Sequence, residues 1–331
     1  MPSETRSNSR PAWPELPYAA WRETCTTLHL WSQIVGKARM ARTPWLNHSW
    51  HVPLYVSVRG LNTSLIPNGS RPFEMEFDFI GHVLRIAVSD GTGADVPLRP
   101  QCVSEFYRAV LSALGELGID VRIREMPNEI ADAVPFSRDD RHCAYDPDYA
   151  HRFWQALLQA ERVFEQFRTG FLGKCSPVHF FWGSFDLAVS RFSGRRAPLH
   201  KGGVPNLPDA VAREAYSHEV SSAGFWPGGG GAEEAAFYSY AYPEPEGFRS
   251  FPVRPEAAFF SESLAEFVLP YEAVRTAADP DAALLEFLQT TYDAAAIKGA
   301  WDRDALECDF GRPGVPRPLQ APAKPARAQR S

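Results

Sequence analysis

The stretch Phe73-Glu-Met-Glu-Phe-Asp-Phe79 alternates strictly between apolar and acidic residues. Successive side chains of a β-strand point to opposite faces, so Phe73, Met75, Phe77 and Phe79 share one face and the three acids share the other. Such alternation is typical of a strand in an antiparallel sheet that buries one face and leaves the other in water. The stretch therefore predicts a half-buried antiparallel sheet.

Further strands and four helices are predicted around this stretch. The predicted strands are 51–59, 82–88, 119–124, 179–192, 216–225 and 236–242, with a pair around Phe259 and Phe267. Apolar residues that recur every three or four positions predict helices at 19–35 and 103–117, and from Asp146-Pro147 and Asp279-Pro280 onward. Asp caps the first turn of a helix, and Pro fits its first position. The order of elements predicts an α+β fold with mainly antiparallel sheets.

The chain is predicted to contain two similar helix–sheet–helix halves packed as one unit. The predicted ranges are 13–145 and 146–308 for the halves, with disordered tails at 1–12 and at 309–331, the latter rich in Pro and Ala and basic. Aligning Trp50 with Trp182 also aligns Arg59 with Arg191. An internal duplication around a central cleft is one interpretation. The other is that a common order of elements occurs twice by chance.

Composition limits the classes of function. The 331-residue chain has a formal net charge of -6, which argues against nucleic-acid binding because that function usually needs a basic surface. No apolar run approaches the roughly 18 residues that span a bilayer, and the first residues lack a secretory signal. The five widely spaced cysteines, without a Cys-x-x-Cys pair, indicate reduced thiols. We therefore expect a cytoplasmic protein without a membrane or nucleic-acid partner.

Aromatic and polar residues concentrate in three stretches. Aromatic residues make up 13% of the chain, including nine Trp, and such enrichment often accompanies aromatic-lined pockets. The stretches 43–55, 176–196 and 215–230 combine Trp, Phe and Tyr with His, Ser, Asp and Arg. Strong nucleotide-binding and hydrolase signatures are absent from the sequence. We therefore predict a cleft built from these stretches.

Asp186 is the most unusual polar residue in the second stretch. Strand alternation places His179 and Phe181 on one face, and Trp182 and Asp186 on the other. A carboxylate in an apolar strand is costly to bury unless something pairs with it. Two interpretations stay open: an ion pair between Asp186 and a nearby Arg that fixes the strand, or a role in a functional site.

Histidines supply the second candidate chemistry. His218 shares a strand face with Tyr216 and Trp226, whereas Glu219 points to the opposite face. A single His on an apolar face is most often a hydrogen-bonded core residue. If His179 and His218 converge with a carboxylate, they would suit a zinc or iron site. A His–carboxylate pair without metal would suit acid–base catalysis instead.

The turn Arg191-Phe-Ser-Gly-Arg195-Arg196 is a third clue. Guanidinium groups bind carboxylate and phosphate through paired hydrogen bonds, so arginines in an acidic protein can mark an anionic ligand. A solvated basic loop is the alternative. The predicted catalytic residues are His179, His218, Glu219 and Asp186, with His179 and His218 also as metal ligands; the predicted substrate-binding residues are Arg191, Arg195, Trp182, Trp226, Tyr216 and Trp50.

Five segments of the chain resemble one known family. They are WPELPYAAWRETCTTLHLWSQIVGK, NHSWHVPLYVSVRGL, GKCSPVHFFWGSFDLAVSRFSGR, YSHEVSSAGFWPGGG and YSYAYPEPEGF. These segments are similar to a bacterial family catalogued as domain of unknown function number 5996, over about residues 13–305. The resemblance implies one architecture for nearly the whole chain and implies no activity, cofactor or catalytic residue.

Three functions remain open from the sequence. The first is a small-molecule enzyme with an aromatic- and histidine-lined pocket, metal-dependent or not, that acts on an anionic substrate. The second is a non-catalytic protein that binds a small ligand against its aromatic side chains. The third is a structural partner protein, which would show a contiguous apolar surface patch rather than a cleft.

Overall fold

The computed structural model describes residues 13–229 and 233–317. Within this part, the chain forms helices and two antiparallel sheets, which confirms the predicted α+β class. The helices are α1 (Tyr18–Met40), α2 (Val103–Glu116), α3 (Pro147–Arg168), α4 (Asp209–Ala215), α5 (Tyr271–Arg275), α6 (Pro280–Lys298) and α7 (Arg303–Leu306), with short 3-10 turns η1 (Asn47–Ser49) and η2 (Phe136–Arg138). The strands are β1 (Tyr55–Val56), β2 (Gly60–Asn62), β3 (Phe73–Asp78), β4 (Val83–Val88), β5 (Gly93–Pro97), β6 (His179–Phe181), β7 (Asp186–Arg196), β8 (His218–Trp226), β9 (Ala236–Tyr242), β10 (Phe259–Ser261) and β11 (Glu266–Pro270).

In both sheets, almost all strands that pair with each other are also consecutive along the chain. The first has the order β1-β2-β3-β4-β5, and the second has the order β10-β11-β9-β8-β7-β6. The alternating stretch is strand β3, in which Phe73, Met75 and Phe77 are buried, as predicted. Asp78 is also buried, and its carboxylate accepts a hydrogen bond of 2.7 Å from Arg59 Nε. A buried carboxylate is tolerated here because it is paired.

Both predicted Asp-Pro helix starts are present. Asp146 accepts hydrogen bonds from the backbone N–H groups of Asp148 and Tyr149, and Pro147 begins α3. Asp279 accepts one from Ala282, and Pro280 begins α6. These side chains satisfy N–H groups that have no partner within the first turn of a helix.

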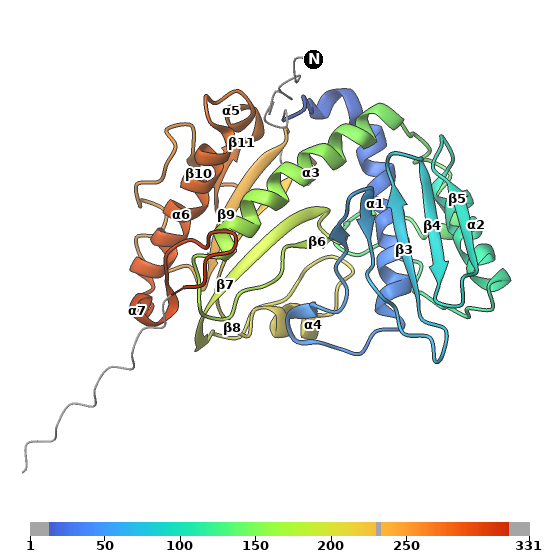
Figure 1. The fold of residues 1–331 in the computed structure, drawn as a ribbon, viewed down its shortest axis with the longest axis horizontal. Helices are drawn as coiled ribbons and strands as arrows, with labels where there is room; N and C mark the ends of the chain where they lie inside the picture. Colours follow the sequence, from blue (N-terminus) through green and yellow to red (C-terminus); the bar gives the residue numbers. More distant parts are fainter. Residues whose placement is uncertain (1–12, 230–232, 318–331) are drawn as a thin grey trace, which may run out of the picture.

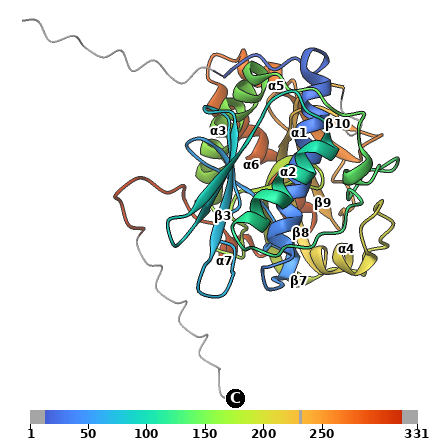
Figure 2. The same ribbon diagram turned by 90° about the vertical axis from the view of Figure 1, so that its right-hand side faces the viewer.

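Helices cover one face of the six-stranded sheet. Helices α3 and α6 pack against each other, α3 packs on β7, and α6 packs on β8 and β9. Figure 1 shows α1 running between the two sheets. In Figure 2, α4 lies on the side of the six-stranded sheet away from α3 and α6. The face of the sheet toward α4 is therefore left for the site described below.

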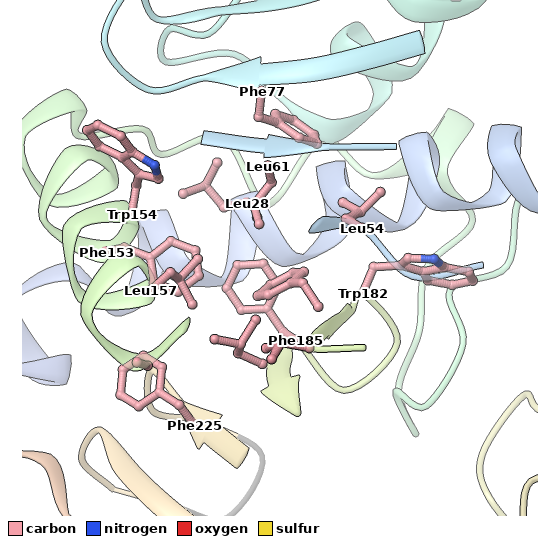
Figure 3. Close-up of a cluster of buried hydrophobic side chains, with 14 of the residues drawn as sticks. Leu28, Leu54, Leu61, Phe77, Phe153, Trp154, Leu157, Trp182, Phe185 and Phe225 are labelled. Carbon is pink, nitrogen blue, oxygen red and sulfur yellow. The ribbon is translucent and has the colours of Figure 1, made fainter. Parts of the chain in front are cut away.

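The two predicted halves share one hydrophobic core. Buried side chains from both sheets and from α1, α2, α3 and α6 form a single cluster. Figure 3 shows Leu28 of α1, Leu61 of β2, Phe153 of α3 and Phe225 of β8 in this cluster. From Thr24 onward, helix α1 is buried on nearly all sides, as expected for a helix at the centre of a protein.

Three predicted strands differ from the structure. In the predicted strand 51–59, Tyr55 and Val56 pair with β2, and Leu54 forms an isolated bridge with Phe180 of β6. The predicted strand 119–124 is an irregular segment. The predicted strand 179–192 is a hairpin of β6 and β7, because the chain turns at residues 182–185 and Phe185 adopts a φ of 59°.

The prediction that all cysteines are unpaired is wrong. Cys102 and Cys143 form a disulfide that links the start of α2 to the segment before α3. The 41-residue separation between them gave no local signal of pairing. Cys25, Cys175 and Cys308 are free. Among the described residues, none of the helices is long and apolar enough to cross a membrane.

The structure does not confirm an internal duplication. The two sheets differ in strand number and order. Trp50 follows a 3-10 turn, whereas Trp182 follows strand β6. Arg59 is partly exposed and pairs with Asp78, whereas Arg191 is buried, so the aligned positions have different surroundings.

The predicted tails are only partly described. Residues 1–12 and 318–331 lie outside the described part of the chain. Within 309–317, the backbone N–H of Gly311 donates to Thr169 Oγ1 at 2.9 Å, and Arg317 Nη2 donates to the Thr169 carbonyl. This portion of the predicted C-terminal tail therefore lies against the end of α3.

Candidate functional site

A cavity of about 540 Å³ lies over the face of the six-stranded sheet that α3 and α6 leave uncovered. This volume is within the range of small-molecule sites. Its walls come from α1 and the segments 45–52 and 124–129 in the first half, and from β6 to β9, β11 and the segment 204–216 in the second. The cavity thus forms where both halves of the chain meet. Its aromatic lining consists of Trp45, Trp50, Phe181, Trp182, Phe192, Tyr216, Trp226, Tyr238 and Tyr240.

A row of polar side chains crosses the floor of the cavity. Ser190 of β7 pairs across the sheet with Ser222 of β8, and their hydroxyl oxygens are 2.9 Å apart. Ser222 pairs in turn with Tyr240 of β9. Glu266 of β11 continues the row, because the next residue, Phe267, pairs with the residue before Tyr240. Opposite residues of neighbouring strands project side by side on one face of a sheet, so these four groups share the cavity face.

Tyr238 reaches Asp186 across an intervening strand. Its hydroxyl donates to Asp186 Oδ2, although Tyr238 lies on β9 and Asp186 on β7. Gly224 of β8 lies between them, and a Cβ atom at Gly224 would be 2.4 Å from the Tyr238 hydroxyl oxygen. Ser184 donates to the other oxygen of Asp186, and Trp226 stacks on Tyr238 at 4.3 Å between ring centroids. The absence of a side chain at Gly224 therefore makes this hydrogen bond sterically feasible.

Three carboxyl groups with raised pKa values line the cavity. Burial raises the pKa of Asp186 to about 6, opposed by the hydrogen bonds from Ser184 and Tyr238. Burial and then the charge of Asp186 raise the pKa of Glu129 to about 7 and that of Glu266 to about 8. Glu129 exposes surface to the cavity itself, yet protein atoms surround it on most sides. Groups that titrate near neutral pH can both give and take protons.

One face of α1 holds the segment that carries Glu129. The Gln33 side chain donates to the Asn128 carbonyl at 2.9 Å and accepts from the Asn128 N–H at 2.8 Å. Lys37 Nζ donates to the Met126 carbonyl at 2.7 Å and to Asn128 Oδ1. These bonds fix the backbone next to Glu129.

Glu129 itself packs against the β6–β7 turn. A Cβ atom on Gly183 would be 2.0 Å from Glu129 Oε1, so the carboxyl group lies directly on the Gly183 backbone. His29 Nε2 is 2.8 Å from the Gly183 carbonyl oxygen, which ties the same turn to α1. Glu129 has a φ of 64°, a backbone conformation that is uncommon for residues other than Gly and is often found at functional sites.

Two histidines of the segment 45–52 also line the cavity. His48 Nδ1 is 2.8 Å from the Ala215 carbonyl, and its Nε2 is 2.6 Å from Lys174 Nζ. A carbonyl accepts and an ammonium donates, so the proton of His48 is on Nδ1. His51 Nδ1 accepts from the Leu46 N–H at 3.2 Å, which leaves its proton on Nε2. Burial lowers the pKa of both imidazoles.

Comparison with known proteins identifies the family. Residues 13–308 match a family of unknown function, DUF5996. The chain belongs to DUF5996. No curated protein and no solved structure matches it. The match spans the continuous core of this DUF5996 protein and carries no chemistry.

Five of the predicted site residues line the cavity. They are Asp186, Trp182, Trp226, Tyr216 and Trp50. Asp186 accepts hydrogen bonds from Tyr238 and Ser184. The predicted ion pair with an Arg is therefore not what holds it, and the predicted role in a functional site did not specify these partners. The Trp182 indole N–H donates to the Val52 carbonyl at 2.8 Å.

His179 lies outside the cavity lining. It is fully buried, and neither ring nitrogen has a hydrogen-bond partner within the part of the chain that the structure describes. Its ring packs edge-on against Trp50, Tyr55 and Phe181. Burial lowers the pKa of His179 to about 3, so the imidazole is neutral. The structure places it in aromatic packing, where it pairs across the β6–β7 hairpin with Ala188 rather than with Asp186.

His218 also lies apart from His179. His179 pairs with Ala188 near the start of β7, whereas His218 pairs with Arg196 at its end. The nearest imidazole to His218 is that of His48, with ring centroids 6.0 Å apart. Across residues 13–229 and 233–317, no group of three or more His, Cys, Asp or Glu side chains is arranged to hold a metal ion. The metal site predicted from the sequence, with His179 and His218 as ligands beside a carboxylate, is therefore not formed by these residues.

The predicted Glu219, Arg191 and Arg195 project from the other face of the sheet. Glu219 accepts from Arg195 Nη2 at 2.7 Å and from Ser193 Oγ at 2.8 Å. Arg195 also donates to the carbonyl oxygens of Gly299 and Ala300 at the end of α6. Arg191 is buried under α3 and α6 against three aromatic rings. Arg191 and Arg195 contact the helical layer, Glu219 pairs with Arg195, and none of the three lines the cavity.

Sequence reasoning missed Glu129, Glu266, Tyr238 and Tyr240. Glu129 lies in an irregular segment, where no periodicity assigns a side chain to a face. Tyr238 and Tyr240 alternate within Ala236–Tyr242 and face the cavity together. Their alternation with Phe237 and Ser239 was the available signal, and it required knowing that β9 adjoins β8.

Replacing Glu266 with Gln is expected to change the pH dependence of stability. A carboxyl group whose pKa is raised in the folded state destabilises the fold as the pH rises from the pKa of the unfolded state to that of the folded state, which is about 8 for Glu266. We therefore expect the free energy of unfolding of Glu266→Gln to rise by about 1–2 kcal/mol relative to that of the wild type when the pH goes from 5 to 9. Urea unfolding at both pH values measures the difference.

The matched control for this experiment is Glu262→Gln. Glu262 is exposed between β10 and β11 and accepts from Arg249 at 2.8 Å. Its substitution should give the same stability difference at pH 5 and pH 9. If Glu266→Gln behaves like this control, Glu266 does not hold a proton in the folded protein near neutral pH.

Proposed function

We propose that this DUF5996 protein is a small-molecule enzyme that uses acid–base catalysis in the cavity described above. The observation that carries the proposal is the Asp186 carboxyl group, held by Tyr238 and Ser184 within an aromatic wall. Its raised pKa of about 6 suits it to accept a proton at neutral pH and return it later. The proposal requires no metal, in line with the donor geometry.

Glu129 and Glu266 are the candidates for the general acid that works with Asp186. Burial raises the pKa of Glu129 to about 7 and that of Glu266 to about 8, so both keep a proton to higher pH than Asp186, whose pKa is about 6. Carboxyl groups whose pKa values are separated by their surroundings commonly divide the acid and base roles. We assign Asp186 as the base and Glu129, which is exposed to the cavity, as the acid.

The substrate would be a molecule with a flat or apolar body. Trp50, Trp182 and Trp226 with three tyrosines supply stacking surfaces. The sequence-based hypothesis of an anionic substrate depended on Arg191 and Arg195. Neither guanidinium group lines the cavity, so neither supports that hypothesis.

A metabolite turnover experiment tests the proposal. The purified protein is incubated at pH 7.5 with pooled small aromatic and heterocyclic metabolites, and mass spectrometry follows consumption and product formation. We expect at least one compound to be converted. Asp186→Asn should slow that conversion by about 100-fold or more, because a positioned general base contributes on this scale. Glu219→Gln, on the far face of the sheet, is the control and should keep the wild-type rate.

Non-catalytic ligand binding is the alternative, favoured by the number of aromatic side chains in the lining. Under this alternative, compounds are retained by the protein and recovered unchanged. Conversion by Asp186→Asn at the wild-type rate would overturn the assignment of the base. Retention without conversion of any compound would replace the enzyme with a binding protein.

A further inference from the structure

We infer that the ligand of the cavity carries a protonated amine on its aromatic or apolar body. The inference deepens the proposed function and rests on it, since it concerns the same cavity. It names the charge class of the substrate, which the sequence-based hypothesis took to be anionic. Three features of the wall support it: the balance of charges, the aromatic surfaces and the free hydrogen-bonding capacity.

Acidic groups outnumber accessible cationic groups in the lining. Three carboxyl groups line the cavity. Lys37 is 1% exposed, and its ammonium donates to Met126 and Asn128, so it stabilises the wall rather than facing a ligand. Arg124 is the other lining cation, and it is exposed. At pH 7.5 the ionised carboxyl groups, foremost Asp186 with the lowest pKa of the three, would attract a cationic ligand and repel an anionic one.

The aromatic wall next to Asp186 also favours a cation. Trp226 and Tyr238 stack beside this carboxyl group, and Tyr240 lies nearly parallel to Tyr238 at 6.2 Å between centroids. The faces of aromatic rings carry partial negative charge and attract ammonium groups within about 6 Å. Aromatic rings around a carboxylate therefore form a site that suits a substituted ammonium group.

The acidic groups retain acceptor capacity for an ammonium donor. Asp186 accepts one hydrogen bond on each oxygen, and an ionised carboxylate offers about four acceptor positions. Glu266 Oε2 has no hydrogen-bond partner among the described residues. His48 presents no free acceptor, because Lys174 occupies its Nε2. Among the described lining residues, the Ser49 hydroxyl oxygen is also without a partner, so the unfilled acceptors that can carry charge belong to the carboxyl groups.

Three indoles of similar size and different charge test this inference. They are tryptamine, indole-3-propionamide and indole-3-propionate, titrated into the full-length protein by calorimetry at pH 7.5. We expect tryptamine to bind at least tenfold more tightly than the other two. Asp186→Asn and Glu129→Gln should each reduce that preference to threefold or less while still binding indole-3-propionamide. Glu219→Gln, outside the cavity, should leave all three affinities unchanged.

The pH dependence of binding gives a second readout. Besides the carboxyl groups, the titratable or charged side chains of the lining are Lys37, Arg124, His48, His51 and the three tyrosines. His48 accepts from Lys174 and His51 accepts from the Leu46 N–H, so protonation of either imidazole would break a hydrogen bond, and burial lowers both pKa values. Burial raises the pKa values of the tyrosines, and it lowers that of Lys37 to about 8, so Lys37 stays mainly protonated between pH 6 and pH 7.5. Ionisation of carboxyl groups should then tighten tryptamine binding about threefold over this range. Indole-3-propionate would show the opposite trend.

The outcomes separate this inference from the proposed function. If the amide or the propionate binds as tightly as tryptamine, the cavity remains the ligand site and the charge assignment is overturned. If tryptamine binds selectively and no compound is converted in the turnover experiment, the charge assignment stands and the enzyme proposal fails. If none of the three indoles binds at millimolar concentration, the inference is overturned.

Discussion

Gly224→Ala is expected to destabilise the protein and to disconnect Tyr238 from Asp186. The new methyl group would be 2.4 Å from the Tyr238 hydroxyl and 2.5 Å from the Leu187 carbonyl oxygen. The carbonyl belongs to the paired backbone of β7 and cannot move freely, so the strands must separate slightly or Tyr238 must rotate away. We expect a loss of about 2–3 kcal/mol, typical of overpacking a tight contact.

The same substitution should raise the pKa of Asp186, because the hydrogen bond from Tyr238 now lowers it. Carboxyl carbon chemical shifts followed through a pH titration measure this change, and urea unfolding measures the stability. Tyr238→Phe removes the hydroxyl without crowding, and it should raise the pKa with a smaller loss of stability. If Gly224→Ala leaves the pKa of Asp186 and the stability unchanged, Gly224 is not required for the hydrogen bond that Tyr238 makes to Asp186 across β8.

Gly115→Ala is the matched control. Gly115 lies near the end of α2, and a Cβ atom there meets nothing within 4 Å. Ala is a better helix former than Gly, so the substitution should stabilise the protein by about 0.5–1 kcal/mol. The opposite signs of the two Gly-to-Ala substitutions would show that the cost at Gly224 is steric.

Arg191→Ala is expected to give the largest loss of stability. The Arg191 guanidinium lies 3.4 Å from the ring centroid of Phe167 and 4.4 Å from that of Tyr292, and it donates to the Phe167 carbonyl. The residue is 1% exposed. Truncation would leave a cavity between the sheet and α3 and α6, at a cost of about 3–5 kcal/mol.

Two further variants separate packing from charge. Arg191→Met keeps an unbranched side chain of similar length, so it should lose less stability than Arg191→Ala. Arg195→Ala removes a half-exposed guanidinium from the same strand, and should cost about 1 kcal/mol or less. Urea unfolding compares the three. A loss below about 1 kcal/mol in Arg191→Ala, together with weaker ligand binding, would restore the substrate-binding role predicted from the sequence.

The sequence predicted most elements of the fold because their signals are local. Periodic apolar residues and Asp-Pro caps identified the long helices, and alternation identified β3. The β6–β7 hairpin was missed because aromatic residues continue through its turn, so the hydrophobic pattern does not break at Gly183. The Cys102–Cys143 pair was missed because chain folding, rather than spacing, brings the two thiols together.

The site was partly predictable for the same reason. Alternation placed Trp182 and Asp186 on one face, and both line the cavity, but it put Phe181 on the opposite face, whereas Phe181 pairs with Asp186 across the hairpin and lines the same cavity. The same rule assigns Arg191 to the opposite face, since it is five residues from Asp186. The prediction combined residues of both faces because charge suggested a common role. The Glu129 position could not be derived, since it depends on hydrogen bonds from α1 to an irregular segment.

The cavity walls extend along the chain from Lys37 on α1 to Glu266 on β11. No fragment that lacks either end can therefore reproduce the binding surface, and dismantling the surface requires the shared core to open. A compound that occupies it opposes unfolding of the entire molecule, with a gain that grows logarithmically with its free concentration. Melting temperature thus reports occupancy whatever the chemistry of the compound, and an unbiased library can be screened on the intact protein by thermal shift.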